Sequence, residues 1–202
     1  MIQKAASKKG RRGARSRPQR IVLRVTLRHT EPPIWREINV PDSYSLFQVH
    51  RCIQLAFAWL DYHLFEFQIG ARRFERALAE AEGEDAESVQ LRDLALTARS
   101  AFLYLYDMGD YWEHEIAVRA VTDVPLSAEP DLLAYLVDGA RAAPPEDVGG
   151  PPGYERAIAA FRRQSVEDEE TLIWLGPGFD PEVFDLRAGN HALMLATAWS
   201  AI

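Results

Sequence analysis

The stretch AFLYLYDMGDYWEHEIAVRAV (residues 101–121) decides the fold class, because it has the pattern of two strands joined by a short turn. Aromatic and β-branched residues fill both halves, and DMGD (107–110) separates them. We expect a β-hairpin whose turn uses Gly109 at a positive φ angle. Strand alternation then places the aromatic side chains of the first half on one face: Phe102, Tyr104 and Tyr106.

The same alternation divides the polar residues of the second half. Glu113 and Glu115 face one way, towards solvent or a partner, and the core face carries Trp112, His114, Ile116 and Val118. The polar groups of the hairpin therefore do not all converge. Three residues remain as candidates for a site at its corner: Asp107, Asp110 and His114.

Upstream of the hairpin, three segments alternate like strands: residues 21–30, 34–40 and 63–70. Between them, LFQVHRCIQLAFAWL (46–60) has helical periodicity, and Ser45 is its predicted N-cap. We expect the core stripe of this helix to contain Leu46, Val49, Ile53, Phe57 and Leu60.

Downstream segments contain fewer strand signals. Residues 76–90 are acidic and predict a solvated helix or loop, and the chain after Pro125 looks loop-like. Residues 143–155 carry four prolines and three glycines, too irregular for a helix, and helices are expected at 154–163, 167–176 and 186–199. The order predicts an α+β fold: a mainly antiparallel sheet with helices packed on one face and C-terminal helices.

Composition sets further bounds. The 202 residues are 48% apolar, which is typical of a globular protein, and no run approaches the roughly 18 apolar residues of a membrane helix. We therefore expect no membrane partner. Cys52 is the only cysteine and no secretory signal is evident, so we expect a cytoplasmic protein with Cys52 as a small buried hydrophobe.

Charge divides the chain into a basic tail (residues 1–20) and a single domain (21–202). The tail holds eight Lys or Arg and no acid, whereas the remainder holds 15 basic and 30 acidic residues. We expect the tail to be disordered. The tail could neutralise nucleic-acid phosphates. Alternatively, it could be a solubilising extension or an arm that folds back on the acidic domain, and we slightly favour these two alternatives over nucleic-acid binding. The candidate contacts are Lys8, Lys9, Arg11, Arg12, Arg15 and Arg17.

Two further histidines bear on a site. His50, with Gln54 one turn later, lies beside the apolar stripe of its helix, and His63 begins a strand. A cleft holding His50, His63 and His114 would be an acid–base or ligand site. A metal could take Asp107, Asp110 and His114, but no HExxH, paired CxxC or EF-hand spacing is present. We therefore favour a structural role for these residues over a ligand role, with the aspartates capping the turn and the histidines packed in the fold. We expect no metal, no other cofactor and no catalytic residue.

Five segments in this order resemble the plasmid pRiA4b ORF-3-like family, which occurs on plasmids and as passenger proteins of insertion sequences. They are PPIWREINVP (32–41), VHRCIQLAFAW (49–59) with HLFEF (63–67), YDMGDYWEHEI (106–116), PPEDVGGPPGYE (144–155) and FDPEVFD (179–185). The resemblance covers residues 21–195 and implies a compact α+β domain with no established reaction.

The chain departs from the family pattern at several positions. The pattern often has a cysteine in PPEDCGG and another upstream, but Val148 stands here and no cysteine occurs between Ala134 and Gly150. YDMGD replaces the usual YDFGD, Tyr111 stands where a small or polar residue is common, and Phe65 replaces the second histidine of HLHEF. A Cys/His metal site of that pattern would therefore be incomplete in this chain.

The leading hypothesis is a non-enzymatic accessory or interaction protein of mobile elements. Its basic tail would contact nucleic acid weakly, and its acidic domain would bind a protein partner or small ligand. The alternative is an enzyme or a metal- or ligand-binding protein centred on the His/Asp residues. A toxin–antitoxin or regulatory partner is a third hypothesis.

Overall fold

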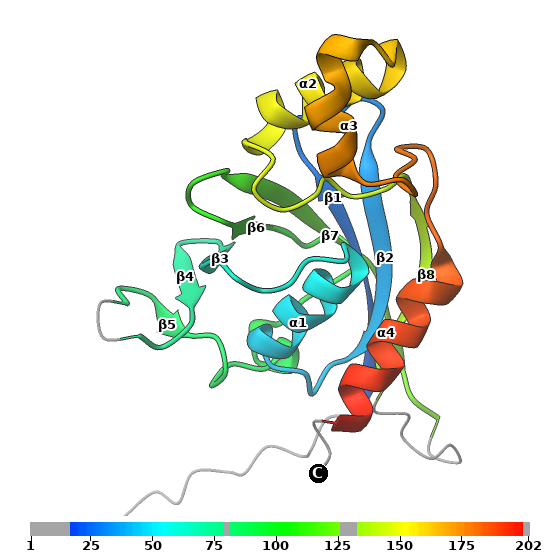
Figure 1. Cartoon of the computed structure of the whole chain (residues 1–202). Helices are drawn as coiled ribbons and strands as arrows, with labels where there is room; N and C mark the ends of the chain where they lie inside the picture. Colours follow the sequence, from blue (N-terminus) through cyan, green and yellow to red (C-terminus); the bar gives the residue numbers. More distant parts are fainter. Residues whose placement is uncertain (1–16, 79–80, 126–132, 200–202) are drawn as a thin grey trace, which may run out of the picture.

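A single twisted sheet organises the computed structural model, which describes residues 17–78, 81–125 and 133–199. Within those residues, eight strands follow the order β5-β4-β3-β6-β7-β1-β2-β8 (Figure 1). All pairs are antiparallel except the parallel pair β4–β5. The strands are β1 (Gln19–Leu27), β2 (Ile34–Pro41), β3 (Phe65–Ile69), β4 (Arg72–Glu75), β5 (Glu84–Asp85), β6 (Ala101–Tyr106), β7 (Trp112–Asp123) and β8 (Tyr135–Ala140).

Four helices cover one face and one end of the sheet. α1 (Leu46–Ala56) contacts α4 (Leu186–Trp199), and α4 packs on β8. α2 (Gly150–Arg163) and α3 (Glu169–Leu175) pack on each other at the end of the sheet, at the top of Figure 1. Short 3-10 turns occupy Leu91–Leu94 and Val166–Asp168. The α+β prediction is confirmed. In the described residues, no helix combines the length and apolarity needed to cross a bilayer.

The 101–121 hairpin forms as predicted, with β6 paired to β7 and Tyr106 opposite Trp112. The predicted core face of β7 and the aromatic face of β6 are both buried, and Glu115 is exposed on the other side. The prediction for Gly109 is wrong, because the positive φ angles belong to Asp107 (56°) and Tyr111 (57°). The Asp107 carboxylate accepts from the amides of Gly109 and Asp110, and these bonds fix the turn locally.

The helix predicted over 46–60 begins at its Ser45 cap but ends at Ala56, four residues early. Ala58 takes a positive φ of 56°, and the amide of Trp59 bonds the carbonyl of Gln54 at 2.8 Å. Together with the bond from the Ala58 amide to the Leu55 carbonyl, this is a Schellman closure. Leu60 consequently lies outside the helix and is 63% exposed, so its assignment to the core was wrong.

Three further segments differ from expectation. Residues 76–78 and 81–90, the described part of the acidic segment, contain no helix but include β5, because Glu84 and Asp85 pair with β4. The loop-like region after Pro125 includes β8, which pairs with β2. α2 begins at Gly150 rather than Tyr154, with prolines in its first turn, where a missing amide proton costs no helical hydrogen bond.

Strand β1 begins within residues 1–20, the range predicted as a basic tail. Gln19 and Arg20 belong to β1, and Arg20 Nε donates to Asn39 Oδ1 at 2.7 Å. Arg17 is exposed just before this strand. The remaining tail candidates lie outside the described residues: Lys8, Lys9, Arg11, Arg12 and Arg15.

Candidate functional site

Three segments that are distant in sequence meet beside the hairpin turn: residues 59–64 before β3, residues 107–110 after β6, and residues 144–149 before α2. Tyr106 joins them. Its hydroxyl donates to Glu146 Oε1 at 2.7 Å and accepts from the Tyr62 amide at 3.2 Å. The PPEDVGG loop is thus fastened to the turn and to the approach to β3.

Further bonds fix the loop. Trp59 Nε1 donates to the Pro144 carbonyl at 2.8 Å, and the Leu60 amide donates to Glu146 Oε1 at 3.0 Å. At the other end of the loop, the Gly149 amide donates to Asp110 Oδ2 at 3.0 Å. Asp110 therefore holds two segments together.

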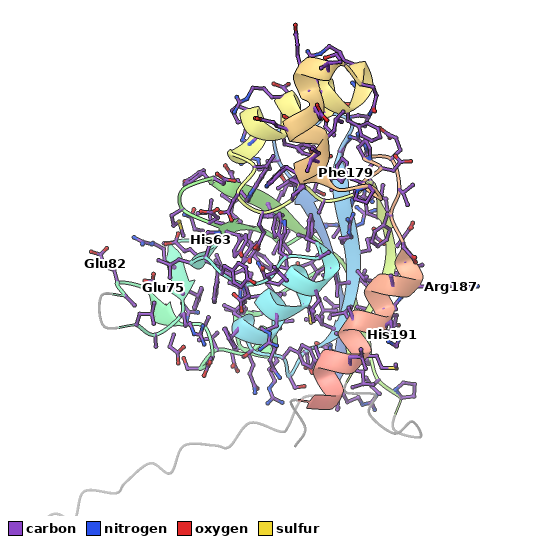
Figure 2. All side chains as sticks on the ribbon, viewed as in Figure 1. His63, Glu75, Glu82, Phe179, Arg187 and His191 are labelled. Carbon is purple, nitrogen blue, oxygen red and sulfur yellow. The ribbon has the colours of Figure 1, made fainter. Side chains whose placement is uncertain are left out.

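His63, Asp107 and Asp147 come together where these segments meet, and Figure 2 places His63 beside the start of β3. His63 Nε2 lies 3.1 Å from Asp147 Oδ1 and 3.6 Å from Asp107 Oδ2. One ligand atom from each of the three residues lies within 4.8 Å of the others. The composition and spacing of the group suit a divalent cation.

A pocket of about 390 Å³ opens beside this cluster. Its wall combines charged groups with large apolar side chains. The lining residues are Asp61, Tyr62, His63, Leu64, Phe65, Arg76, Leu78, Asp107, Met108 and Gly109. The pocket is thus a mixed surface that can hold an apolar group close to carboxylates.

His50 and Gln54 lie behind the pocket wall, in the core. The Tyr104 hydroxyl forms hydrogen bonds with His50 Nδ1 at 2.8 Å and with Gln54 Nε2 at 2.9 Å. The other ring nitrogen of His50, Nε2, forms a hydrogen bond with Asp61 Oδ1 at 2.8 Å. Burial lowers the pKa of His50, and the bond to Asp61 offsets part of this effect. Asp61 alone of this network reaches the pocket.

His114 is fully buried on β7 among aromatic rings. Phe57 and Trp59 contact it edge-on, and Tyr104 packs against it at 5.3 Å between ring centres. Neither ring nitrogen makes a well-formed hydrogen bond to any described residue. Burial lowers its pKa to about 3, with the nearby carbonyls of Tyr104 and Trp112 opposing this effect. His114 is therefore neutral at physiological pH.

Of the predicted candidates, His63 and Asp107 lie together in the open cluster, with Asp110 beside them holding the loop. His50 and Gln54 lie together in the core, at the Tyr104 hydroxyl. His50 and His114 are 0% exposed and face Tyr104, so the three histidines do not share an open cleft. Burial raises the pKa of Cys52 to about 12, in agreement with its expected role as a buried hydrophobe.

Sequence reasoning missed Asp147 and Glu146 as site residues. Both lie in the PPEDVGG segment, which stood out as an irregular loop and as part of the family resemblance. The usable signal was the occurrence of three distinctive segments in one chain: HLFEF, YDMGD and PPEDVGG. Their joint presence indicated the family, but it did not show which atoms meet.

Comparisons with known proteins agree with this architecture. Residues 19–188 match the family described as "Plasmid pRiA4b ORF-3-like protein". The chain belongs to this family. The uncharacterized protein y4hQ of Sinorhizobium fredii is 34% identical over 187 residues, covering 88% of this chain and 93% of that protein. A Methanosarcina mazei Go1 protein of unknown function, MM3350, has a crystal structure similar to this one, with a TM-score of 0.74 and 31% identity, covering 85% of this chain and 98% of that one.

The match to the pRiA4b ORF-3-like family includes the candidate site but gives it no assigned reaction. Its matched region contains the whole described cluster, from His63 to Asp147. Both relatives are described as uncharacterized or of unknown function, so they assign no reaction to the family. The function has to be argued from the site itself.

Proposed function

We propose that this chain is a non-enzymatic accessory or interaction protein associated with mobile elements, which binds a protein segment at the pocket beside His63. The observation that carries the proposal is the set of apolar side chains around this pocket. Four large side chains that line it are between 45% and 71% exposed: Tyr62, Leu64, Leu78 and Met108. Exposed apolar side chains gathered at one hollow are typical of an interaction site.

The pocket also suggests the chemistry of the partner. Its carboxylates, Asp61 and Asp107, and the adjacent Asp147 outnumber the single arginine, Arg76. Met108 is a flexible, polarizable side chain that adapts to different apolar surfaces. A partner segment with an apolar side chain flanked by Lys or Arg would satisfy both features.

The positions of the perturbed titratable groups favour binding over catalysis. Enzymes place groups with shifted pKa values in the cleft where substrate binds. Here three groups with shifted pKa values that adjoin the site, His50, Tyr104 and His114, lie in the core behind it. None of these three lines the pocket. Asp61 is the exception: it lines the pocket, and although burial raises its pKa, the hydrogen bond and charge of His50 outweigh this and lower it.

The binding test uses peptides selected from a random-sequence display library on the wild-type protein. We expect the selected peptides to combine apolar and basic residues. Leu64→Glu should weaken their binding by about 10-fold or more, because a carboxylate would then occupy the apolar wall. Fluorescence anisotropy with a labelled peptide measures the dissociation constants.

Val183→Glu is the matched control, since Val183 is also exposed but lies outside the pocket. It should bind the selected peptides as the wild type does. Equal binding by wild type and Leu64→Glu would show that the pocket is not the interaction site. Thermal melts of both variants verify that each retains its fold.

A second candidate function, weak nucleic-acid contact through the basic tail, is favoured by the charge division of the chain. Eight basic residues and no acid in residues 1–20 precede an acidic remainder. The plasmid in the family description agrees with a role near DNA. Electrostatic contact of this type is independent of base sequence and strongly dependent on salt.

Neutralising the tail in the full-length chain tests this function. We expect replacement of the six candidate residues by Gln to weaken binding to duplex DNA by about 10-fold or more at low salt, with a shallower salt dependence. Replacing the exposed Arg92 and Arg99 by Gln should leave binding unchanged. If the wild-type and neutralised chains bind DNA equally, the tail has no such role.

A further inference from the structure

We propose that His63, Asp107 and Asp147 form a binding site for a divalent metal ion, with zinc as the preferred ion. The three side chains come from three different segments: the approach to β3, the end of β6 and the loop before α2. The site goes beyond the proposed binding of a protein segment, because a metal could bind here with or without a partner in the pocket. Imidazole nitrogen and carboxylate oxygen are ligands that zinc takes in proteins.

The spacing of the ligand atoms matches a shared cation. Zinc bonds of 2.0 to 2.1 Å in tetrahedral geometry place neighbouring ligand atoms about 3.3 Å apart. His63 Nε2 lies 3.1 Å from Asp147 Oδ1 and 3.6 Å from Asp107 Oδ2, on either side of that value. These two pairs therefore need little movement to bind one ion, and the two carboxylate oxygens lie within 4.8 Å of each other.

The orientation of the His63 side chain also supports a metal site. Nε2 is shielded from solvent, yet it makes no hydrogen bond to any described residue, although a carboxylate oxygen lies 3.1 Å away. Asp147 Oδ1 thus lies off the axis along which this nitrogen would donate a proton, and Asp107 Oδ2, at 3.6 Å, is too far for a hydrogen bond. Close ligand atoms that are not aligned for a hydrogen bond with one another are expected around a shared metal ion, because each ligand atom is directed at the ion.

The surrounding structure holds the ligands in place. Asp107 Oδ1 accepts from the amides of Gly109 and Asp110, at 2.9 and 3.3 Å, and Oδ2 remains directed to His63. The loop that carries Asp147 is fastened on both sides, by Glu146 to Tyr106 and by Gly149 to Asp110. Outer contacts of this kind orient metal ligands and raise affinity.

Charge and exposure also fit an ion with an open position. The two carboxylates carry a negative charge that a divalent cation would balance, and an imidazole nitrogen that binds the cation adds no charge of its own. The Asp147 side chain is 70% exposed, so the outer side of the cluster is accessible to water or to a ligand. Three protein ligands and one open position are typical of zinc sites that bind an external group.

Isothermal titration of the chelator-treated full-length protein with zinc chloride tests the site, without any peptide present. We expect one ion per chain and a dissociation constant in the micromolar range or tighter. Asp147→Asn should weaken binding by about 100-fold or more, since even the loss of an outer-shell contact costs roughly 10- to 100-fold. Cobalt should give the visible spectrum of a four-coordinate ion in the wild type, and His63→Gln should abolish that spectrum.

Asp138→Asn is the matched control, because it removes the same charge from an exposed aspartate on β8. It should bind zinc as tightly as the wild type. Equal affinity of wild type and Asp147→Asn, or no saturable binding by the wild type, would overturn the proposal and leave His63 as an ion-pair partner of the two aspartates. Melting curves in chelator verify that both variants are folded.

Discussion

Lowering the pH from 7 to 4 should cost the folded chain about 3 kcal/mol of stability through His114 alone, and His114→Leu should remove that loss. The His114 pKa is about 3 in the folded chain, below the ordinary value of 6.5. As the pH falls, the unfolded chain takes up the proton first. The stability is therefore fully present above about pH 6.5 and is lost as the pH falls towards 3.

The structural reason is the aromatic enclosure of His114. A charged imidazole there would be surrounded by Phe57, Trp59 and Tyr104, and its ring nitrogens have no well-formed hydrogen bond to a described residue. At pH 7 the neutral ring already lacks a well-formed hydrogen bond from either nitrogen to the residues that the structure describes. We therefore expect His114→Leu to be at least as stable as the wild type at neutral pH.

Urea unfolding at a series of pH values measures this effect. His191→Leu is the control, because His191 is exposed on α4 (Figure 2). Burial also lowers the pKa of His50, so some acid sensitivity should persist in the His114 variant. A pH profile of His114→Leu that parallels the wild type would show that His114 is hydrated in the folded chain.

Gly153→Ala should destabilise the chain by about 3 kcal/mol or more, although alanine normally favours a helix over glycine by about 1 kcal/mol. A Cβ at this position would lie 1.8 Å from the Val148 carbonyl oxygen and 2.7 Å from its carbon. Both atoms are backbone, so they cannot rotate away as a side chain could. The first turn of α2 would have to move away from the PPEDVGG loop.

This movement should reach the candidate site. The same loop carries Asp147 and bonds Asp110 through the Gly149 amide, so zinc affinity should fall together with stability. Gly178→Ala is the control, because a Cβ there would meet no atom within 4 Å. Thermal melts and urea unfolding compare the two variants. A Gly153→Ala chain as stable as the wild type would indicate that α2 and the loop are packed more loosely than the structure shows.

The fold class could be predicted because strand alternation depends only on neighbours along the chain. The faces of the 101–121 hairpin and the Ser45 cap followed from local pattern. β8 could not be predicted, since its sequence lacks a clear alternation and its pairing depends on β2 and α4. Asn190 illustrates this dependence: its side chain bonds both the amide and the carbonyl of Leu136.

The candidate site was only half predictable for a related reason. His63 and Asp107 were recognised as ligand types, and Asp147 was not, because it lies 40 residues beyond Asp107 in a loop with no metal-binding spacing. Histidines 50 and 114 looked equally suitable in sequence. Packing buried both of them in the core.

The sequence alone thus determined the family, the α+β class and the faces of the central hairpin, because periodicity and short motifs are properties of adjacent residues. Only the tertiary structure decided which polar residues meet. Tyr106 and Asp110 draw the loop before α2 onto the hairpin turn, and this contact places Asp147 beside His63 and Asp107. Contacts between segments this far apart depend on how whole elements pack, which no local pattern encodes.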